Sequence, residues 1–172
     1  MERKKGYYKM NQTLKYIFIN AFFWVLVHFA SSYLVHFLPD KIYDCKNLLF
    51  KTRKIEINGN IYKKFFKINL WKDYLPEAGK FLGLHPFSKK HFISKSNQYI
   101  KRFILETCRG ELAHILPFLF LPVSFIWNPT FADIITLFYV IIFNIPFIMV
   151  QRYNRIRLVN LLNKESVIPF SS

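Results

Sequence analysis

Four side chains that can move protons or bind charge lie within nine residues at the start of an apolar run, in the stretch ETCRGELAHIL. They are Glu106, Arg109, Glu111 and His114. On a helix they share one broad face and the aliphatic side chains share the other, while Gly110 leaves space between Glu106 and His114. An imidazole can act as a general base, and a guanidinium can stabilise a developing anion. The cluster therefore indicates a catalytic site or, as the alternative, an ion-pair clamp.

A second line of polar residues begins inside a later apolar run and continues past its end at helical spacing: Asn144, Gln151 and Arg155. Folding the two runs into a hairpin about Pro129 would place His114 level with Asn144 and Glu106 level with Arg152. We therefore predict that Glu106 and Arg152 pair across the hairpin. Ionisable groups at membrane depth indicate function by default. In the clamp interpretation the two glutamates only neutralise arginines of the hairpin, and the protein is a non-catalytic membrane scaffold.

The cysteines and the Glu-x-x-His pattern predict no metal and no cofactor. A di-metal helical site needs a second Glu-x-x-His pair, which this sequence lacks. Cys45 and Cys108 form neither a disulfide framework nor a zinc pattern, so we expect free thiols in a reducing compartment. Cys108 falls on the apolar side of its helix, which favours a buried, unreactive thiol.

The composition favours an integral membrane protein. The 172 residues are 52% hydrophobic and 19% aromatic, and they carry a net charge of +15. The basic residues lie between long apolar stretches, as in the cytoplasmic loops of membrane proteins. No nucleic-acid-binding motif accompanies the positive charge, so we expect no nucleic acid partner.

We predict a single all-α membrane domain over residues 1–172. Residues 14–38 are apolar for long enough to cross a bilayer as one helix, or they fold back as a hairpin. A secretory signal peptide is the alternative, but the apolar part is long and no clear cleavage site follows it. Residues 106–158 are expected to form a transmembrane helical hairpin that carries the polar cluster, and residues 159–172 form a tail.

The middle region, residues 39–105, is predicted to lie at the membrane surface. It holds 15 Lys and Arg against 5 Asp and Glu, a net charge of +10. The sequence EINGNIY predicts a β-hairpin turn at Asn58-Gly59. The aromatic residues that follow, Phe65 and Trp71 among them, are expected to sink between lipid headgroups with lysines above them. A soluble helix that packs these aromatic residues into a small core is the alternative.

The basic flanks predict the orientation of the protein in the cell membrane. The middle region and the tail lie at one end of the hairpin and are both basic, so we expect them in the cytoplasm of a multi-pass protein. The N-terminus is basic as well, yet a single first span would place it outside. The sequence alone leaves this conflict open.

Three stretches resemble the glycosyl-4,4′-diaponeurosporenoate acyltransferase family, which is associated with the last step of staphyloxanthin-type carotenoid synthesis. They are ETCRGELAHI, FFKINLWKDYLPEAG and FYVIIFNIPFIMVQRYNRIRL. The most specific piece is QRYNR after an apolar span, and the resemblance runs from the first apolar run to Leu158. The sequence departs from the family pattern at Ile115, where tryptophan is expected, and at Ile156, where proline is expected.

The resemblance implies an O-acyltransferase that esterifies a fatty acyl group onto the sugar C6 hydroxyl of a glycosylated carotenoid; another glycolipid acceptor is the alternative. It implies His114 as general base, Glu111 or Glu106 as the residue that orients it, and Arg109 with Asn144 or Gln151 at the oxyanion. Acyl-CoA or another acyl carrier would be the co-substrate, with membrane lipid and other pathway enzymes as partners. The expected substrate-binding residues are Asn144, Gln151, Arg152, Tyr153, Asn154, Arg155, Trp71 and Lys72.

Overall fold

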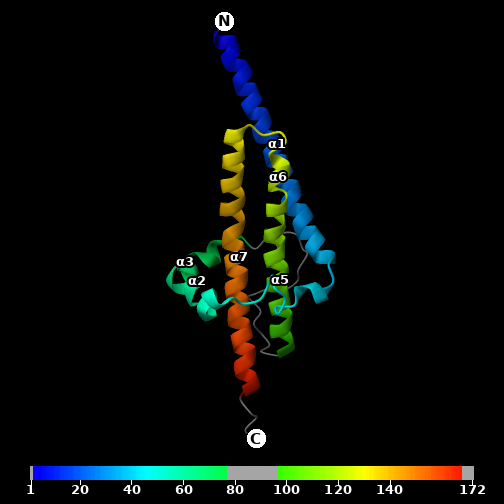
Figure 1. Cartoon of the computed structure of the whole chain (residues 1–172), viewed down its shortest axis with the longest axis vertical. Helices are drawn as coiled ribbons and strands as arrows, with labels where there is room; N and C mark the ends of the chain where they lie inside the picture. The colour runs from blue at the N-terminus through cyan, green and yellow to red at the C-terminus, as the bar shows by residue number, and fades with distance from the viewer. Residues whose placement is uncertain (1, 77–96, 168–172) are drawn as a thin grey trace.

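Three long helices build the protein in the computed structural model, which describes residues 2–76 and 97–167 (Figure 1). They are α1 (Glu2–Phe37), α5 (Asn97–Leu119) and α7 (Thr130–Val167). The described residues contain no strand, only helices and the turns between them. The prediction of an all-helical protein with long apolar helices is confirmed.

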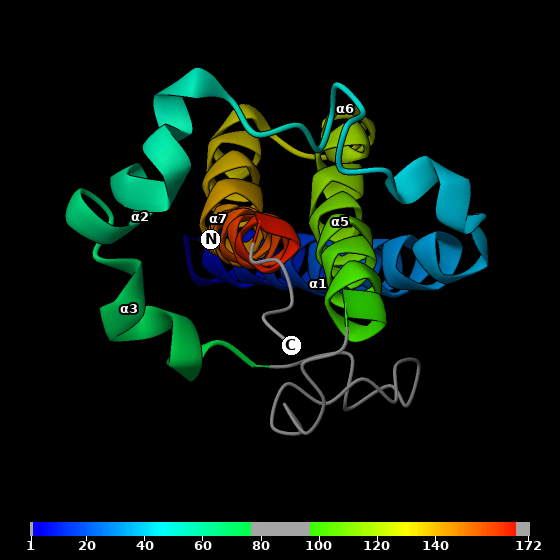
Figure 2. The ribbon, with the colours of Figure 1, turned by 90° about the horizontal axis from the view of Figure 1, so that it is seen from below.

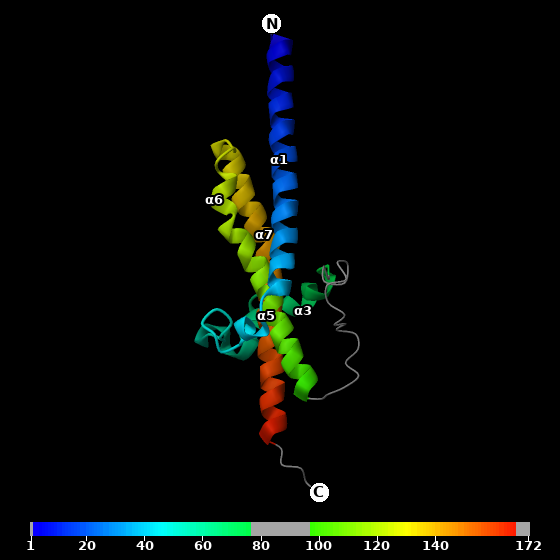
Figure 3. The same ribbon diagram turned by 90° about the vertical axis from the view of Figure 1, so that its right-hand side faces the viewer.

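The first apolar run is a single helix and not a hairpin. α1 continues without a break from Glu2 to Phe37, and its N-terminal turns extend past the turn between α5 and α7 (Figures 1 and 3). Near that turn, the amides of Asn20 and Asn128 donate to each other over 2.7 and 3.1 Å. This reciprocal pair fixes the level of α1 along the other two helices.

The predicted pair of antiparallel helices is present and is longer than residues 106–158, although of the two helices only α7 is long and apolar enough to cross a membrane. α5 already begins at Asn97 and α7 continues to Val167, with the four-residue helix α6 (Leu121–Ser124) between them. Proline lacks the backbone N–H that a helix interior needs, so it favours the first turn of a helix. Pro122 accordingly stands at the start of α6 and Pro129 directly before α7.

Two helices are long and apolar enough to cross a membrane, over Met10–Phe37 and Thr130–Lys164. Only 17% and 22% of their most apolar windows are buried inside the protein. The core helix of a soluble protein of this size would bury most of such a stretch, whereas here its large side chains face outward. This arrangement fits helices that contact lipid.

Up to Pro76, the middle region forms short helices that lie beside the hairpin (Figure 2). They are the 3₁₀ helices η1 (Asp40–Tyr43), η2 (Lys54–Gly59) and η3 (Lys72–Tyr74) and the α-helices α2 (Asn60–Lys64) and α3 (Ile68–Trp71). The predicted β-hairpin at Asn58-Gly59 is wrong. Both residues do take the left-handed conformation of such a turn, with φ of 53° and 88°, but they join η2 to α2.

The aromatic residues around α2 and α3 divide between a core and an exposed surface. Tyr62 and Ile68 are buried against Tyr153 of α7 in one apolar cluster, as the small-core interpretation predicts. Phe65 and Leu70 remain 77% and 70% exposed, as a surface that enters a lipid headgroup layer requires. The small core is therefore present, and the placement of the exposed side chains between lipid headgroups stays a prediction.

Candidate active site

His114 on α5 and Asn144 on α7 face each other across the hairpin, as the level-matching predicts. The Nδ1 atom of His114 lies 3.1 Å from the Oδ1 atom of Asn144. The ring of Phe147 stacks on the imidazole with centroids 4.4 Å apart and planes 10° apart. Asn144 is fully buried and His114 is partly buried. The imidazole is thus held on its face and on one of its nitrogen atoms.

The hydrogen bonds of Asn144 determine which nitrogen of His114 carries the proton. The Nδ2 atom of Asn144 donates to the Val140 carbonyl over 2.9 Å, which turns Oδ1 toward His114. An amide oxygen only accepts, so the Nδ1 atom of His114 is the donor. The Nε2 atom of a neutral imidazole in this tautomer carries a free lone pair, as a general base requires.

Gly110 allows the Gln151 side chain to lie against α5 one helical turn from His114. A Cβ atom on Gly110 would stand 3.1 Å from Cδ and Nε2 of Gln151, which is closer than ordinary contacts allow. The space that we expected beside Gly110 is therefore occupied. Within the described residues the Gln151 amide has no hydrogen-bond partner, so its N–H groups are free to donate to a substrate.

Two arginines of α7 and two glutamates form an ion-pair network that we call the inner network: Glu56, Glu111, Arg152 and Arg155. Arg152 lies 2.7 Å from both Glu56 and Glu111, and Glu111 also pairs with Arg155. Glu111 and Arg155 are each only 1% exposed. A buried ion lowers stability strongly when its partner is removed, so these pairs hold α5, α7 and η2 together.

A second ion-pair network, the outer network, joins α5 to η1, the short helix that follows α1: Asp40, Arg102, Glu106 and Arg109. Arg109 lies 2.5 Å from Glu106 and 2.8 Å from Asp40. Arg102 lies 3.0 Å from Glu106 and 2.9 Å from Asp40. The two networks together contain four carboxylates and four guanidinium groups, so their charges balance.

The predicted pair between Glu106 and Arg152 is wrong. Glu106 binds arginines of its own helix, and Arg152 binds Glu111. Side chains lean toward the N-terminus of their helix. In an antiparallel hairpin the side chains of α5 therefore lean away from the turn and those of α7 lean toward it. A long side chain such as Arg152 therefore contacts a residue of the other helix that is several positions away from its own level. The short side chain of Asn144 contacts His114, which lies at the same level.

The segment between α1 and α2 covers both networks with aromatic rings. The guanidinium carbon of Arg109 lies 4.8 Å from the ring centre of Tyr43, and that of Arg155 lies 5.6 Å from the ring centre of Phe50.

Burial alone would raise the pKa of Glu56. Hydrogen bonds from Arg152, the Arg53 backbone and Tyr62 outweigh burial and hold that pKa below its ordinary value.

Most other predicted substrate-binding residues make contacts within the protein. Arg152 donates to Glu56, Glu111 and the carbonyl oxygens of Leu49 and Lys51. This geometry leaves it few N–H groups for a donor phosphate, and Arg155 is buried on Glu111.

Three of the remaining predicted residues, Tyr153, Trp71 and Lys72, make their contacts in or beside α3. Tyr153 donates from its hydroxyl to Asn69, and the Trp71 indole donates to the Phe66 carbonyl. Lys72 pairs with exposed Asp73, and Asn154 is half-buried. None of these side chains has a recorded contact with His114, so the structure groups Asn144 and Gln151 with the imidazole and separates these four from it.

Sequence reasoning missed two acidic residues of the networks, Asp40 and Glu56. Both belong to the middle region, whose strong net positive charge drew attention to its lysines. Glu56 is 4% exposed, and its carboxylate pairs with Arg152 over 2.7 Å. The available signal was the rarity of carboxylates in a basic segment, since each of them has many potential partners.

Cys108 is fully buried and Cys45 is partly buried, and both are free thiols as predicted. The Sγ atom of Cys108 lies 3.7 Å from an N–H group of Arg155. The thiol packs in an apolar cluster with Tyr43 and Phe50, where a bound substrate has no access to it.

Comparison with known proteins gives one consistent result. The family model described as glycosyl-4,4′-diaponeurosporenoate acyltransferase matches residues 39–164. Proteins of that name from Staphylococcus aureus strains bovine RF122 / ET3-1, MRSA252 and USA300 are each 33% identical over 156 residues. The match covers 89% of this chain and 92% of each relative. No solved structure matches the chain.

Proposed function

The chain belongs to the glycosyl-4,4′-diaponeurosporenoate acyltransferase family, and from this premise we propose that it transfers a fatty acyl group to the C6 hydroxyl of the sugar on a glycosylated carotenoid. The family makes it an acyltransferase. The observation that supports a site for this chemistry is the His114–Asn144 pair, which leaves the Nε2 atom of the imidazole with a free lone pair.

We assign the general base to His114 and its orientation to Asn144. The Nε2 atom of His114 takes the proton of the sugar hydroxyl while that oxygen attacks the acyl carbonyl carbon. The Gln151 amide, one turn away against Gly110, donates to the oxyanion that forms. When the oxyanion collapses, the bond to the carrier breaks and His114 returns the proton to the leaving group.

The ion-pair networks support this site without entering the reaction. Glu111 and Glu106, which the sequence offered as residues that orient the imidazole, bind arginines. Arg109 donates from one terminal nitrogen to Glu106 and from the other to Asp40. We therefore assign these residues to fixing α5 against α7, so that His114 and Asn144 stay level.

Lipid analysis tests the proposed reaction. In a host that makes the glycosylated carotenoid, expression of the chain should produce its acyl ester, measured by mass spectrometry of extracted lipids. Determining which sugar hydroxyl is esterified in the purified product should place the acyl group on C6. An ester that forms equally without the chain, or an acyl group found only on another glycolipid, would reject this acceptor.

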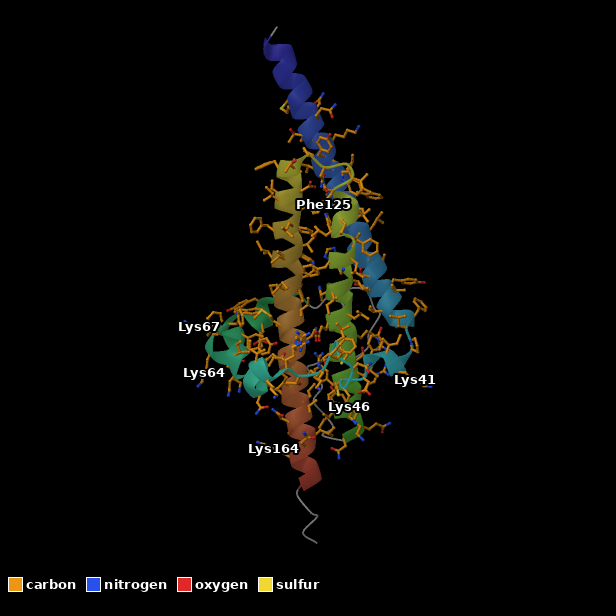
Figure 4. The ribbon with its side chains drawn as sticks, viewed as in Figure 1. Lys41, Lys46, Lys64, Lys67, Phe125 and Lys164 are labelled. Carbon is orange, nitrogen blue, oxygen red and sulfur yellow. The ribbon has the colours of Figure 1, made fainter. Side chains whose placement is uncertain are left out.

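We also propose that the middle region and the C-terminal end of α7 face the cytoplasm and that the N-terminus of α1 lies outside. Lys41, Lys46, Lys64, Lys67 and Lys164 all lie toward the end of the molecule opposite Phe125 (Figure 4). Three parallel or antiparallel helices place the basic N-terminal turns at the other end (Figure 3). The larger basic region then determines the orientation.

Cysteine labelling in intact cells checks this orientation. In a Cys45→Ser background we expect Lys5→Cys to react with a membrane-impermeant maleimide in intact cells. Lys46→Cys, at the opposite end of the molecule, should react only after the membrane is opened. Cys108 is fully buried and should not contribute to the signal. The reverse labelling pattern would contradict the proposed orientation.

A further inference from the structure

A continuous row of aromatic rings leads from His114 along the seam between α1 and α7. The ring of Phe147 stacks on His114, Phe143 lies 6.0 Å from Phe147, and Tyr139 lies 5.6 Å from Phe143. Trp24 of α1 continues the row 5.9 Å from Tyr139. We call these four residues, Phe147, Phe143, Tyr139 and Trp24, the aromatic row.

The row continues from the polar site to the turn of the hairpin. Beyond Trp24 the ring of Phe23 lies 5.2 Å away, and Trp127 lies 4.9 Å from Phe23, next to the turn. Phe147 and Thr130 are 17 residues apart on α7, which is about 26 Å at 1.5 Å per residue. Together with Phe23 and Trp127, the aromatic row therefore follows α7 over nearly the thickness of the hydrocarbon layer of a bilayer, about 30 Å.

Two rings of the aromatic row on α7 are partly exposed. Tyr139 and Phe143 are 38% and 43% exposed, whereas Trp24 behind them is 4% exposed. The Trp24 indole packs against Tyr139, and the His28 ring of α1 lies 4.8 Å from Phe143, so the two α7 rings form a partly exposed shelf that α1 supports from behind. This shelf begins at the candidate base, so a molecule lying on it would present its head to His114.

We infer that the aromatic row binds the conjugated polyene tail of the acceptor and so places the acceptor sugar at His114; this rests on the proposed function. A polyene is flat, rigid and polarizable, and aromatic faces favour such partners. A rigid chain also loses little conformational freedom when it binds. The long axis of the polyene would run along α7 across the membrane, and the sugar would lie at the level of the inner and outer networks.

The test compares two acceptors that share one sugar, a glycosylated carotenoid and a glycoside with a saturated alkyl tail of similar length. Tyr139→Leu and Phe143→Leu keep apolar volume but remove a ring. Each should raise the KM for the polyene acceptor about 2- to 10-fold. The loss of one aromatic contact weakens binding by about this factor, in addition to any loss of buried area. The KM for the saturated acceptor should stay within the error of the wild-type value.

A neighbouring ring outside the aromatic row provides the matched control. Phe138→Leu removes a neighbouring ring that is 58% exposed and makes no ring contact among the described residues, so both KM values should be unchanged. Equal near-ultraviolet circular dichroism of all variants in detergent shows that they are folded.

A binding measurement separates this inference from the proposed reaction. The carotenoid should gain visible circular dichroism when it binds the wild-type protein, and this signal should weaken in Phe143→Leu. Equal KM increases for both acceptors, or an increase only for the acyl donor, would overturn the inference. If the wild type acylates no glycosylated carotenoid, the proposed function fails, and the visible signal still decides the inference: loss in Phe143→Leu supports it and persistence overturns it.

Discussion

Replacing His114 with glutamine is expected to lower the acyl-transfer rate by about 10²- to 10⁴-fold, the usual contribution of a general base. The glutamine amide can still donate a hydrogen bond to Asn144, as the Nδ1 atom of His114 does over 3.1 Å. It cannot accept a proton from a sugar hydroxyl. The rate is measured with purified protein in detergent, and the unacylated glycolipid should accumulate in cells that express the variant.

A matched substitution on α1 separates chemistry from folding. His36 is exposed near the end of α1, where its ring lies 5.3 Å from that of Phe37, so His36→Gln should keep the wild-type rate. Both variants should insert and accumulate equally. An active His114→Gln protein would show that the imidazole is only a structural hydrogen-bonding group, and the assignment of the base would then have to be abandoned.

Replacing Glu111 with glutamine is expected to lower the free energy of unfolding by about 3–5 kcal/mol, the usual effect of removing one partner of a buried ion pair. Glu111 is the carboxylate that Arg152 and Arg155 share, and Arg155 is 1% exposed. Without that charge the buried guanidinium of Arg155 has no counter-ion among the described residues. Denaturant titration in detergent, followed by near-ultraviolet circular dichroism, measures the loss.

An exposed ion pair provides the control for this prediction. Lys72 and Asp73 lie 2.8 Å apart, but the Asp73 side chain is 79% exposed. Asp73→Asn should therefore change the free energy of unfolding by less than about 1 kcal/mol. If Glu111→Gln were equally mild, water or another group would be compensating Arg155, and the inner network would not be what joins the two helices.

The main features of the helices could be predicted from the sequence because they depend on periodicity. Apolar length predicts the long helices, and most of their large side chains are exposed. The prolines predict the turn before Thr130. His114 and Asn144 were matched correctly because one turn position determines the levels of both helices and Asn144 is too short to reach another level.

The partners of the arginines were decided only by the tertiary structure. Arginine side chains are long and lean toward the N-terminus of their helix, so Arg152 reaches Glu111 and not the residue level with it. The path of the irregular segment after α1 brings in Asp40 and Glu56, and no periodic pattern encodes that path. Side chains of regular helices follow the sequence spacing, whereas buried ions take whichever opposite charge the folded chain brings within reach.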